Sequence, residues 1–368
     1  MKNKPLRHVL GISGGKDSAA LAIYLRHRHP ELEMDYYFCD TGKELPETYT
    51  LISNLENYLG QKITHLDAVT GSPEDSFDHF VQVYGGFLPS SSARWCTKKL
   101  KLEPFERYVG TDPVVSYVGI RGDEDREGYI SRKSNIQSIF PFRRNIWSED
   151  VVQRVLQPDS LSRLGGLYAE LSEPATRSRI LALAEAPVSR SFTRPQKLNA
   201  LLDADVKLFN QVVFQLLRDT AYPLAQAPDF ALLDNDENLI REDIFRLLRE
   251  SGVGVPAYYE KRTFEVDGQT GEYARSRSGC YFCFFQQKIE WVWLYEQHPE
   301  KFKQALAYEK DGYTWMEESL TDLIKPERIR QIKLDTIAKQ QRTRQPQSVY
   351  LLDVLEDEES VGCASCFI

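Results

Sequence analysis

A hexapeptide near the N-terminus carries residue types that bind phosphate. It follows a mostly apolar run, 8–12, and precedes an alanine- and leucine-rich segment, an order that predicts a strand, a turn and a helix. Glycines let the backbone approach an anion, hydroxyls and a lysine add donors, and the helix directs its positive end at the turn. The candidate phosphate-binding residues are Ser13, Gly14, Gly15, Lys16, Asp17 and Ser18. Within them, Lys16 and Asp17 are the candidate catalytic residues.

The hexapeptide departs from the two commonest nucleotide-binding patterns. A Walker loop that used Gly15 and Lys16 would need glycine at position 10 and Ser or Thr at position 17. The chain has Leu10 and Asp17 there. The Gly-x-Gly-x-x-Gly dinucleotide pattern is also absent from this turn. The sequence therefore predicts a phosphate site of another kind.

Four of the six cysteines form two Cys-x-x-Cys pairs, Cys280/Cys283 and Cys363/Cys366. In a reducing compartment this spacing indicates a metal, a cluster or redox chemistry. Structural zinc held by both pairs is one alternative, and a site without metal is another. A mobile dithiol at the tail would accept a persulfide or reduce a disulfide, which makes Cys363 and Cys366 candidate catalytic residues.

Alternating strand and helix patterns in the first 145 residues predict the scaffold for these groups. The expected strands are 8–12, 34–39, 63–66 and 114–120, and the expected helices are 18–28, 46–58, 74–84 and 97–108. This alternation predicts an α/β fold, a mostly parallel sheet with helices on both faces. Ligands of such sheets bind beyond the carboxyl ends of the strands. The loops 13–18, 40–42 and 121–125 are therefore expected to converge.

The rest of the chain divides into two parts by pattern. Residues 146–274 show helical spacing with few strand signals and are expected to form a helical insertion, and 275–368 form a cysteine-bearing helical C-terminal region. The formal net charge is -8, yet the segment 325–344 carries seven basic residues and two acidic ones. We find no apolar run of membrane-spanning length and no secretory signal pattern, so we expect a cytoplasmic protein.

The hexapeptide, in its strand-loop-helix context, resembles the Ser-Gly-Gly-x-Asp-Ser loop of the PP-loop ATP pyrophosphatases. The segments 36–49, 92–105 and 114–129 resemble the phosphoadenosine phosphosulfate reductase branch of that superfamily. The resemblance implies the adenine nucleotide alpha-hydrolase-like fold, ATP and magnesium as cofactors, and cleavage between the α- and β-phosphates. It implies further nucleotide contacts from Asp40, Thr41, Gly42, Lys101, Gly119 and Arg121. Magnesium would be positioned by carboxylates, with Asp17, Asp40, Asp123 and Glu124 as candidates.

The same resemblance implies an iron–sulfur cluster. In members that bind a 4Fe–4S cluster, a Cys-Cys pair and a later Cys-x-x-Cys supply four thiolates. This chain keeps Cys96, Cys280 and Cys283, and Trp95 stands where the fourth cysteine would be. Either Cys363 or Cys366 supplies the missing ligand, or the cluster has three protein ligands and one open iron, which we favour. Zinc stays the alternative metal.

The resemblance implies an ATP-dependent sulfurtransferase that acts on nucleic acid. ATP would adenylate a target oxygen, and sulfur would then displace AMP. The pattern is most similar to the ATPase component of bacterial DNA phosphorothioation systems, which implies a role in phage defence, DNA as the partner and a cysteine desulfurase as sulfur donor. Thiolation of tRNA, reduction of a sulfonucleotide and a non-catalytic nucleotide-sensing subunit are the alternatives.

Overall fold

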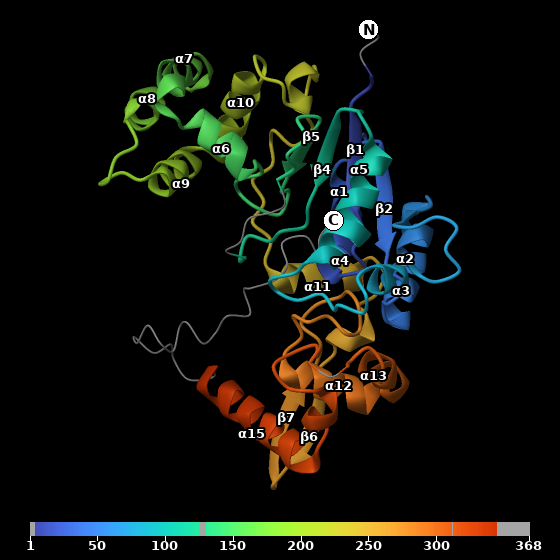
Figure 1. Cartoon of the computed structure of the whole chain (residues 1–368). Helices are drawn as coiled ribbons and strands as arrows, with labels where there is room; N and C mark the ends of the chain where they lie inside the picture. The colour runs from blue at the N-terminus through green and yellow to red at the C-terminus, as the bar shows by residue number, and fades with distance from the viewer. Residues whose placement is uncertain (1–3, 125–129, 311, 344–368) are drawn as a thin grey trace.

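The computed structural model describes residues 4–124, 130–310 and 312–343 (Figure 1). The tail cysteines, Cys363 and Cys366, lie outside these ranges, so their predicted role stays a prediction. No helix in the part of the chain that the structure describes is both long and apolar enough to cross a membrane.

A five-stranded sheet forms the centre of the molecule, with the order β3-β2-β1-β4-β5 and every pair parallel. The strands are β1 (Arg7–Gly11), β2 (Met34–Asp40), β3 (Thr64–Asp67), β4 (Val114–Tyr117) and β5 (Ile136–Ile139). This confirms the predicted α/β fold. The sequence did not predict β5, because two of its four residues, Gln137 and Ser138, are polar although both are buried.

Side chains alternate between the two faces of the sheet, as a pleated strand requires. On one face Val9, Tyr37 and Val114 pack with Phe105 of α5 (Glu103–Val109). The other face packs against α1 (Lys16–Arg28) and α2 (Pro46–Leu59). Buried strands of this kind hold the loops at their carboxyl ends at one fixed edge.

Short helices connect β3 to β4. They are α3 (Ser76–Val83), α4 (Trp95–Thr97) and a π-helical turn, η1 (Lys98–Leu102), which leads into α5. The predicted helix at 97–108 is therefore present but changes its hydrogen-bonding pattern at 98–102. That π-helical turn carries Lys101.

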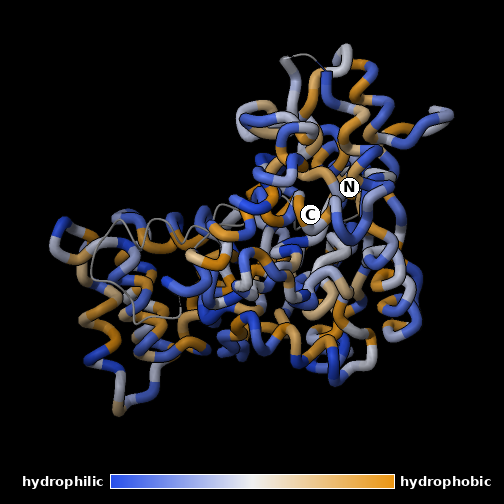
Figure 2. The backbone as a smooth tube through the Cα atoms, turned by 90° about the horizontal axis from the view of Figure 1, so that it is seen from below, coloured by the Kyte–Doolittle hydropathy of each residue, from blue (hydrophilic) through white to orange (hydrophobic). Residues whose placement is uncertain are grey.

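A helical lobe stands to one side of the sheet (Figure 1). It contains α6 (Glu149–Val155), η2 (Pro158–Ser160), α7 (Leu161–Leu171), α8 (Arg177–Glu185), α9 (Arg194–Ala204), α10 (Val206–Leu217) and η3 (Pro223–Gln226). Hydrophobic positions recur along its helices between hydrophilic turns (Figure 2). Helix α11 (Arg241–Glu250) then returns to pack on α1. A single apolar cluster joins Tyr117 of the sheet to Phe209 of α10, so lobe and sheet share one core.

The C-terminal part lies beyond the carboxyl ends of the strands (Figure 1). It contains η4 (Ala257–Tyr259), β6 (Arg262–Val266), β7 (Gln269–Tyr273), α12 (Lys288–Gln297), α13 (Pro299–Leu306), α14 (Leu320–Leu323) and α15 (Pro326–Thr343). Strands β6 and β7 form an antiparallel hairpin, which corrects the prediction of a helical insertion with few strand signals at 146–274. Half of the residues in these two strands are exposed, and both strands carry charged side chains, so their sequence lacks the apolar run that predicts a strand.

Candidate nucleotide site at the carboxyl ends of the strands

The predicted phosphate-binding hexapeptide forms a closed turn between β1 and α1. The hydroxyl oxygen of Ser18 accepts a hydrogen bond from the backbone nitrogen of Ser13 at 3.1 Å, and the two serine hydroxyl oxygens are also 3.1 Å apart. The Ser13 hydroxyl further accepts a bond from the backbone nitrogen of Gly15 at 3.4 Å. The two serines therefore fix the shape of the turn, while the N-terminus of α1 faces the loop.

At two positions around this turn neighbouring atoms lie so close to the backbone that only glycine fits. Gly14 has a φ of +71°, and a Cβ built on it would lie 2.2 Å from Cγ2 of Thr48. Gly119 follows β4, and its Cβ would lie 2.8 Å from the backbone oxygen of Asp17. Any side chain at Gly119 would displace the start of α1, which explains a glycine at this predicted site position.

Three charged side chains are paired at the start of α1. The Lys16 ammonium lies 3.0 Å from one carboxylate oxygen of Asp17, and the Arg121 guanidinium lies 2.8 Å from the other. All three side chains are buried. Burial alone would raise the pKa of Asp17, but the two cations outweigh it and hold that pKa below its ordinary value. The structure thus brings together three predicted site residues, with Asp17 ionised between two cations.

Arg121 also binds the two acidic residues that follow it. Its Nε lies 2.8 Å from Asp123, and its Nη1 lies 3.0 Å from Glu124. The predicted magnesium carboxylates Asp17, Asp123 and Glu124 are therefore all paired to this guanidinium. A bound phosphate would have to share Arg121 with them or displace one of them.

The second predicted loop, Asp40 to Gly42, forms a turn beside the first. A carboxylate oxygen of Asp40 accepts bonds from the backbone nitrogen of Gly42 at 2.8 Å and from the hydroxyl of Tyr49 at 2.9 Å. Thr41 donates to the buried carboxyl of Glu44 at 2.8 Å. Burial, with the nearby charge of Asp40, raises the pKa of Glu44 to about 7. The turn therefore presents a buried acid that the sequence reasoning did not single out.

The C-terminal part completes the first loop. The hydroxyl of Tyr258 donates to the backbone oxygen of Gly14 at 2.9 Å, and that of Tyr259 accepts from the backbone nitrogen of Lys16 at 3.4 Å. The Lys16 ammonium lies 5.1 Å from the centre of the Tyr259 ring, a cation–π contact. A Cβ built on Gly15 would lie 2.5 Å from the hydroxyl of Ser278, so that segment also touches the loop.

The Cys280/Cys283 turn contacts the second loop. The backbone nitrogen of Tyr281 donates to the backbone oxygen of Lys43 at 2.9 Å, and the Cys280 sulfur lies 3.3 Å from the Thr41 hydroxyl. Burial raises the pKa of both thiols, although the charge of Lys101 opposes the shift. The charge of Lys101, the predicted phosphate contact, therefore reaches both thiols of the cysteine pair.

The predicted metal ligands do not form a metal-binding group in this structure. Within residues 4–124, 130–310 and 312–343, no three His, Cys, Asp or Glu side chains are arranged to hold a metal ion. Cys96 and Cys280 pack against the same apolar cluster, and the Cys283 thiol is near enough to contribute to the raised pKa of Cys280. The described residues thus do not present the ligand set of a 4Fe–4S cluster or of zinc, and both stay predictions.

The parallel sheet and the closed serine-glycine turn together define a PP-loop nucleotide-binding domain. Residues 7–155 match the family model described as the phosphoadenosine phosphosulfate reductase domain. Residues 7–155 therefore carry a phosphoadenosine phosphosulfate reductase domain, a domain of the PP-loop ATP pyrophosphatase superfamily. Domains of this kind are typical of a nucleotide-utilising enzyme family connected with sulfur chemistry.

Two curated relatives share part of this chain. An uncharacterized protein of Methanocaldococcus jannaschii is 32% identical over 145 residues, which cover 36% of this chain and 28% of that protein. An uncharacterized nin region protein of Escherichia phage lambda is 28% identical over 145 residues, which cover 32% of this chain and 49% of that protein. The chain therefore spans half or less of the length of each relative.

Proposed function

We propose that this protein is an ATP pyrophosphatase that adenylates an oxygen of a nucleic-acid target and so prepares it for replacement by sulfur, most favourably a non-bridging oxygen of the DNA backbone. The observation that carries the proposal is the complete hexapeptide turn, with Lys16 and Arg121 held on Asp17 at its helical end. Two fixed cations beside a helix N-terminus match the charge that develops on a departing pyrophosphate.

The proposed reaction has two displacements. The target oxygen attacks the α-phosphorus of magnesium-bound ATP, the bond to the bridging oxygen of the β-phosphate breaks, and pyrophosphate leaves. A hydrosulfide equivalent then attacks the target phosphorus, and AMP leaves with the transferred oxygen. We propose a cysteine desulfurase as the sulfur source, with a thiol as the reductant that releases its persulfide sulfur as hydrosulfide. In the first displacement, Lys16 and the loop amides would hold the pyrophosphate oxygens, and Arg121 would orient the same group.

Product analysis tests this proposal directly. Purified protein is incubated with magnesium and radiolabelled ATP, with and without duplex DNA, and the products are separated. Pyrophosphate with AMP, either joined to the DNA or released by water, supports the proposal, and ADP with phosphate contradicts it. In a parallel reaction, sulfite released from phosphoadenosine phosphosulfate with a thiol donor would instead favour sulfonucleotide reduction. Product formation with tRNA and not with DNA would move the target to tRNA.

A further inference from the structure

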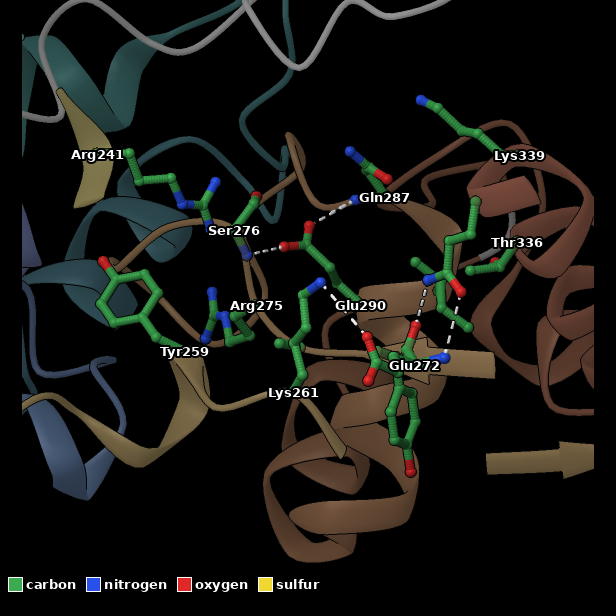
Figure 3. Close-up of a pocket in the computed structure, with 14 residues that line it drawn as sticks. Arg241, Tyr259, Lys261, Glu272, Arg275, Ser276, Gln287, Glu290, Thr336 and Lys339 are labelled. Carbon is green, nitrogen blue, oxygen red and sulfur yellow. Dashed lines mark hydrogen bonds and ion pairs between the residues drawn. The ribbon is translucent and has the colours of Figure 1, made fainter. Parts of the chain in front are cut away.

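A cavity of about 580 Å³ lies beside the candidate nucleotide site. Its walls come from η4, β7, the residues after β7, the start of α12 and the end of α15 (Figure 3). Tyr259 belongs both to this wall and to the support of Lys16 in the hexapeptide turn. The cavity and the phosphate-binding turn therefore share one side chain as a common wall.

Basic side chains dominate the charge of this cavity. Its charged lining consists of Arg241, Lys261, Arg275 and Lys339 against Glu272 and Glu290, and the Lys261 ammonium lies 3.4 Å from a carboxylate oxygen of Glu272. Glu290 is already engaged, because its carboxylate accepts bonds from the backbone nitrogens of Ser276 at 2.6 Å and Gln287 at 2.8 Å. Arg241 and Lys339 lie on opposite sides of the space (Figure 3). The cavity thus has the charge of an anion site.

Two buried donors in the lining lack an acceptor among the described residues. Arg275 is 2% exposed, and its Nη2 donates to the backbone oxygen of Cys280, while its Nε has no hydrogen-bond partner there. The hydroxyl of Ser276 has none either. A buried donor without an acceptor is costly in free energy, and an anionic ligand would supply the missing oxygens.

Two of the basic side chains, Arg241 and Lys261, also line a second cavity. This neighbouring cavity of about 830 Å³ shares Arg241, Tyr259 and Lys261 with the first and adds Arg249 together with Glu242 and Glu260. Two adjacent cavities that share cationic side chains suit a ligand with repeated negative charges better than one with a single anionic group. A nucleic-acid backbone has that repeated charge.

We propose that the cavity of Figure 3 binds a backbone phosphate of the DNA target and holds that strand beside the hexapeptide turn. The inference rests on the proposed function and names the acceptor site of the same reaction. Lys261 and Lys339 contact phosphate oxygens from the surface, and Arg275 supports the inner end of the cavity. Tyr259 separates the acceptor phosphate from the nucleotide phosphates.

The test compares two double variants of the full-length protein. Lys261→Gln with Lys339→Gln removes two charges from the cavity. Lys303→Gln with Lys325→Gln removes two charges elsewhere, at side chains that are 70% and 63% exposed and outside the cavity lining. Affinity for a fluorescein-labelled DNA duplex of about 20 base pairs is measured by anisotropy over a range of salt concentrations. Hydrolysis of ATP to AMP and pyrophosphate without DNA, with water as the acceptor, is measured on the same preparations.

We expect the cavity double variant to bind the duplex at least about tenfold more weakly, with a salt slope smaller by about one for each phosphate that it no longer neutralises. The control double variant should retain parental affinity, and AMP formation without DNA should be unchanged in both. Equal affinities of the two double variants would overturn the inference, as would a parental protein that binds no duplex. A cavity variant that loses ATP binding instead would also overturn it. ADP formation by the parental protein would contradict the proposed function independently of these binding results.

Discussion

The hydroxyl of Tyr259 lies 3.4 Å from the backbone nitrogen of Lys16, although 243 positions separate the two residues. Its neighbour Tyr258 makes a similar contact with Gly14 at 2.9 Å. The phosphate-binding turn is therefore supported by a segment outside the 7–155 family domain. A nucleotide in this turn would meet the C-terminal part of the chain as well as the sheet.

Replacement of Tyr258 by Phe tests this support. The change removes the donor to the backbone oxygen of Gly14 and leaves the ring in place. We expect a loss of about 1 kcal/mol in the free energy of unfolding and a several-fold weaker affinity for ATP. Thermal denaturation and calorimetric titration with magnesium-ATP measure the two effects. The control is Tyr295→Phe, at a side chain that is 37% exposed. Parental ATP affinity in Tyr258→Phe would show that the contact does not shape the site.

Gly119→Ala tests the close approach of β4 to α1. The added Cβ would lie 2.8 Å from the backbone oxygen of Asp17, so the start of α1 must shift. We expect AMP formation to fall by about a hundredfold, because small displacements in a catalytic site are costly. Gly166→Ala in α7 is the control, since nothing lies within 4 Å of its Cβ, and alanine should stabilise that helix by about 0.5–1 kcal/mol. Equal activity of the two variants would contradict the prediction.

Asp17→Asn leaves Lys16 and Arg121 buried without their shared anion. We expect a loss of about 3 kcal/mol in the free energy of unfolding and almost complete loss of AMP formation. Chemical denaturation and product analysis measure the two effects. Asp203→Asn is the matched control, because Asp203 is exposed where it pairs with Arg144, and a change within about 0.5 kcal/mol is expected there. A stable and active Asp17→Asn variant would show that the buried charge triad is dispensable.

The buried carboxyl of Glu44 predicts a pH dependence of stability. Burial and the charge of Asp40 raise its pKa from 4.5 to about 7, so the folded state holds this proton more tightly than the unfolded chain. Its contribution is complete below pH 4.5 and is lost as the pH rises through 7, on the order of 1 to 3 kcal/mol. Denaturation curves of the parent and Glu44→Gln across this window measure the difference. Parallel profiles would mean that Glu44 does not titrate there.

The part of the candidate site that lies on the parallel sheet could be predicted, because each of its residues directly follows a strand in the sequence. The hexapeptide at 13–18, the turn at 40–42 and Arg121 each follow directly after a strand, and parallel strands bring their carboxyl ends to one edge. The strand pattern of β1, β2 and β4 was readable because these strands are apolar and buried on both faces.

The other half could not be predicted from local pattern. Tyr258, Tyr259 and Arg275 precede or follow a short polar hairpin, and nothing in their own neighbourhood indicates that they return to the first loop. In the sequence Glu44 has no feature that distinguishes it from other charged residues. Its burial depends on Tyr49 and Cys280, which lie around the same turn. Such long-range contacts are set by the tertiary fold.

The support of the hexapeptide by Tyr258, Tyr259 and Ser278 has a consequence for synthesis of the protein on the ribosome. All five strands of the sheet precede residue 140, so the sheet has its complete set of strands early in translation. More than a hundred further residues must be synthesised before Tyr258, Tyr259 and Ser278 are available to contact the turn. A nascent chain that ends before η4 thus carries the whole family domain and an incomplete nucleotide site.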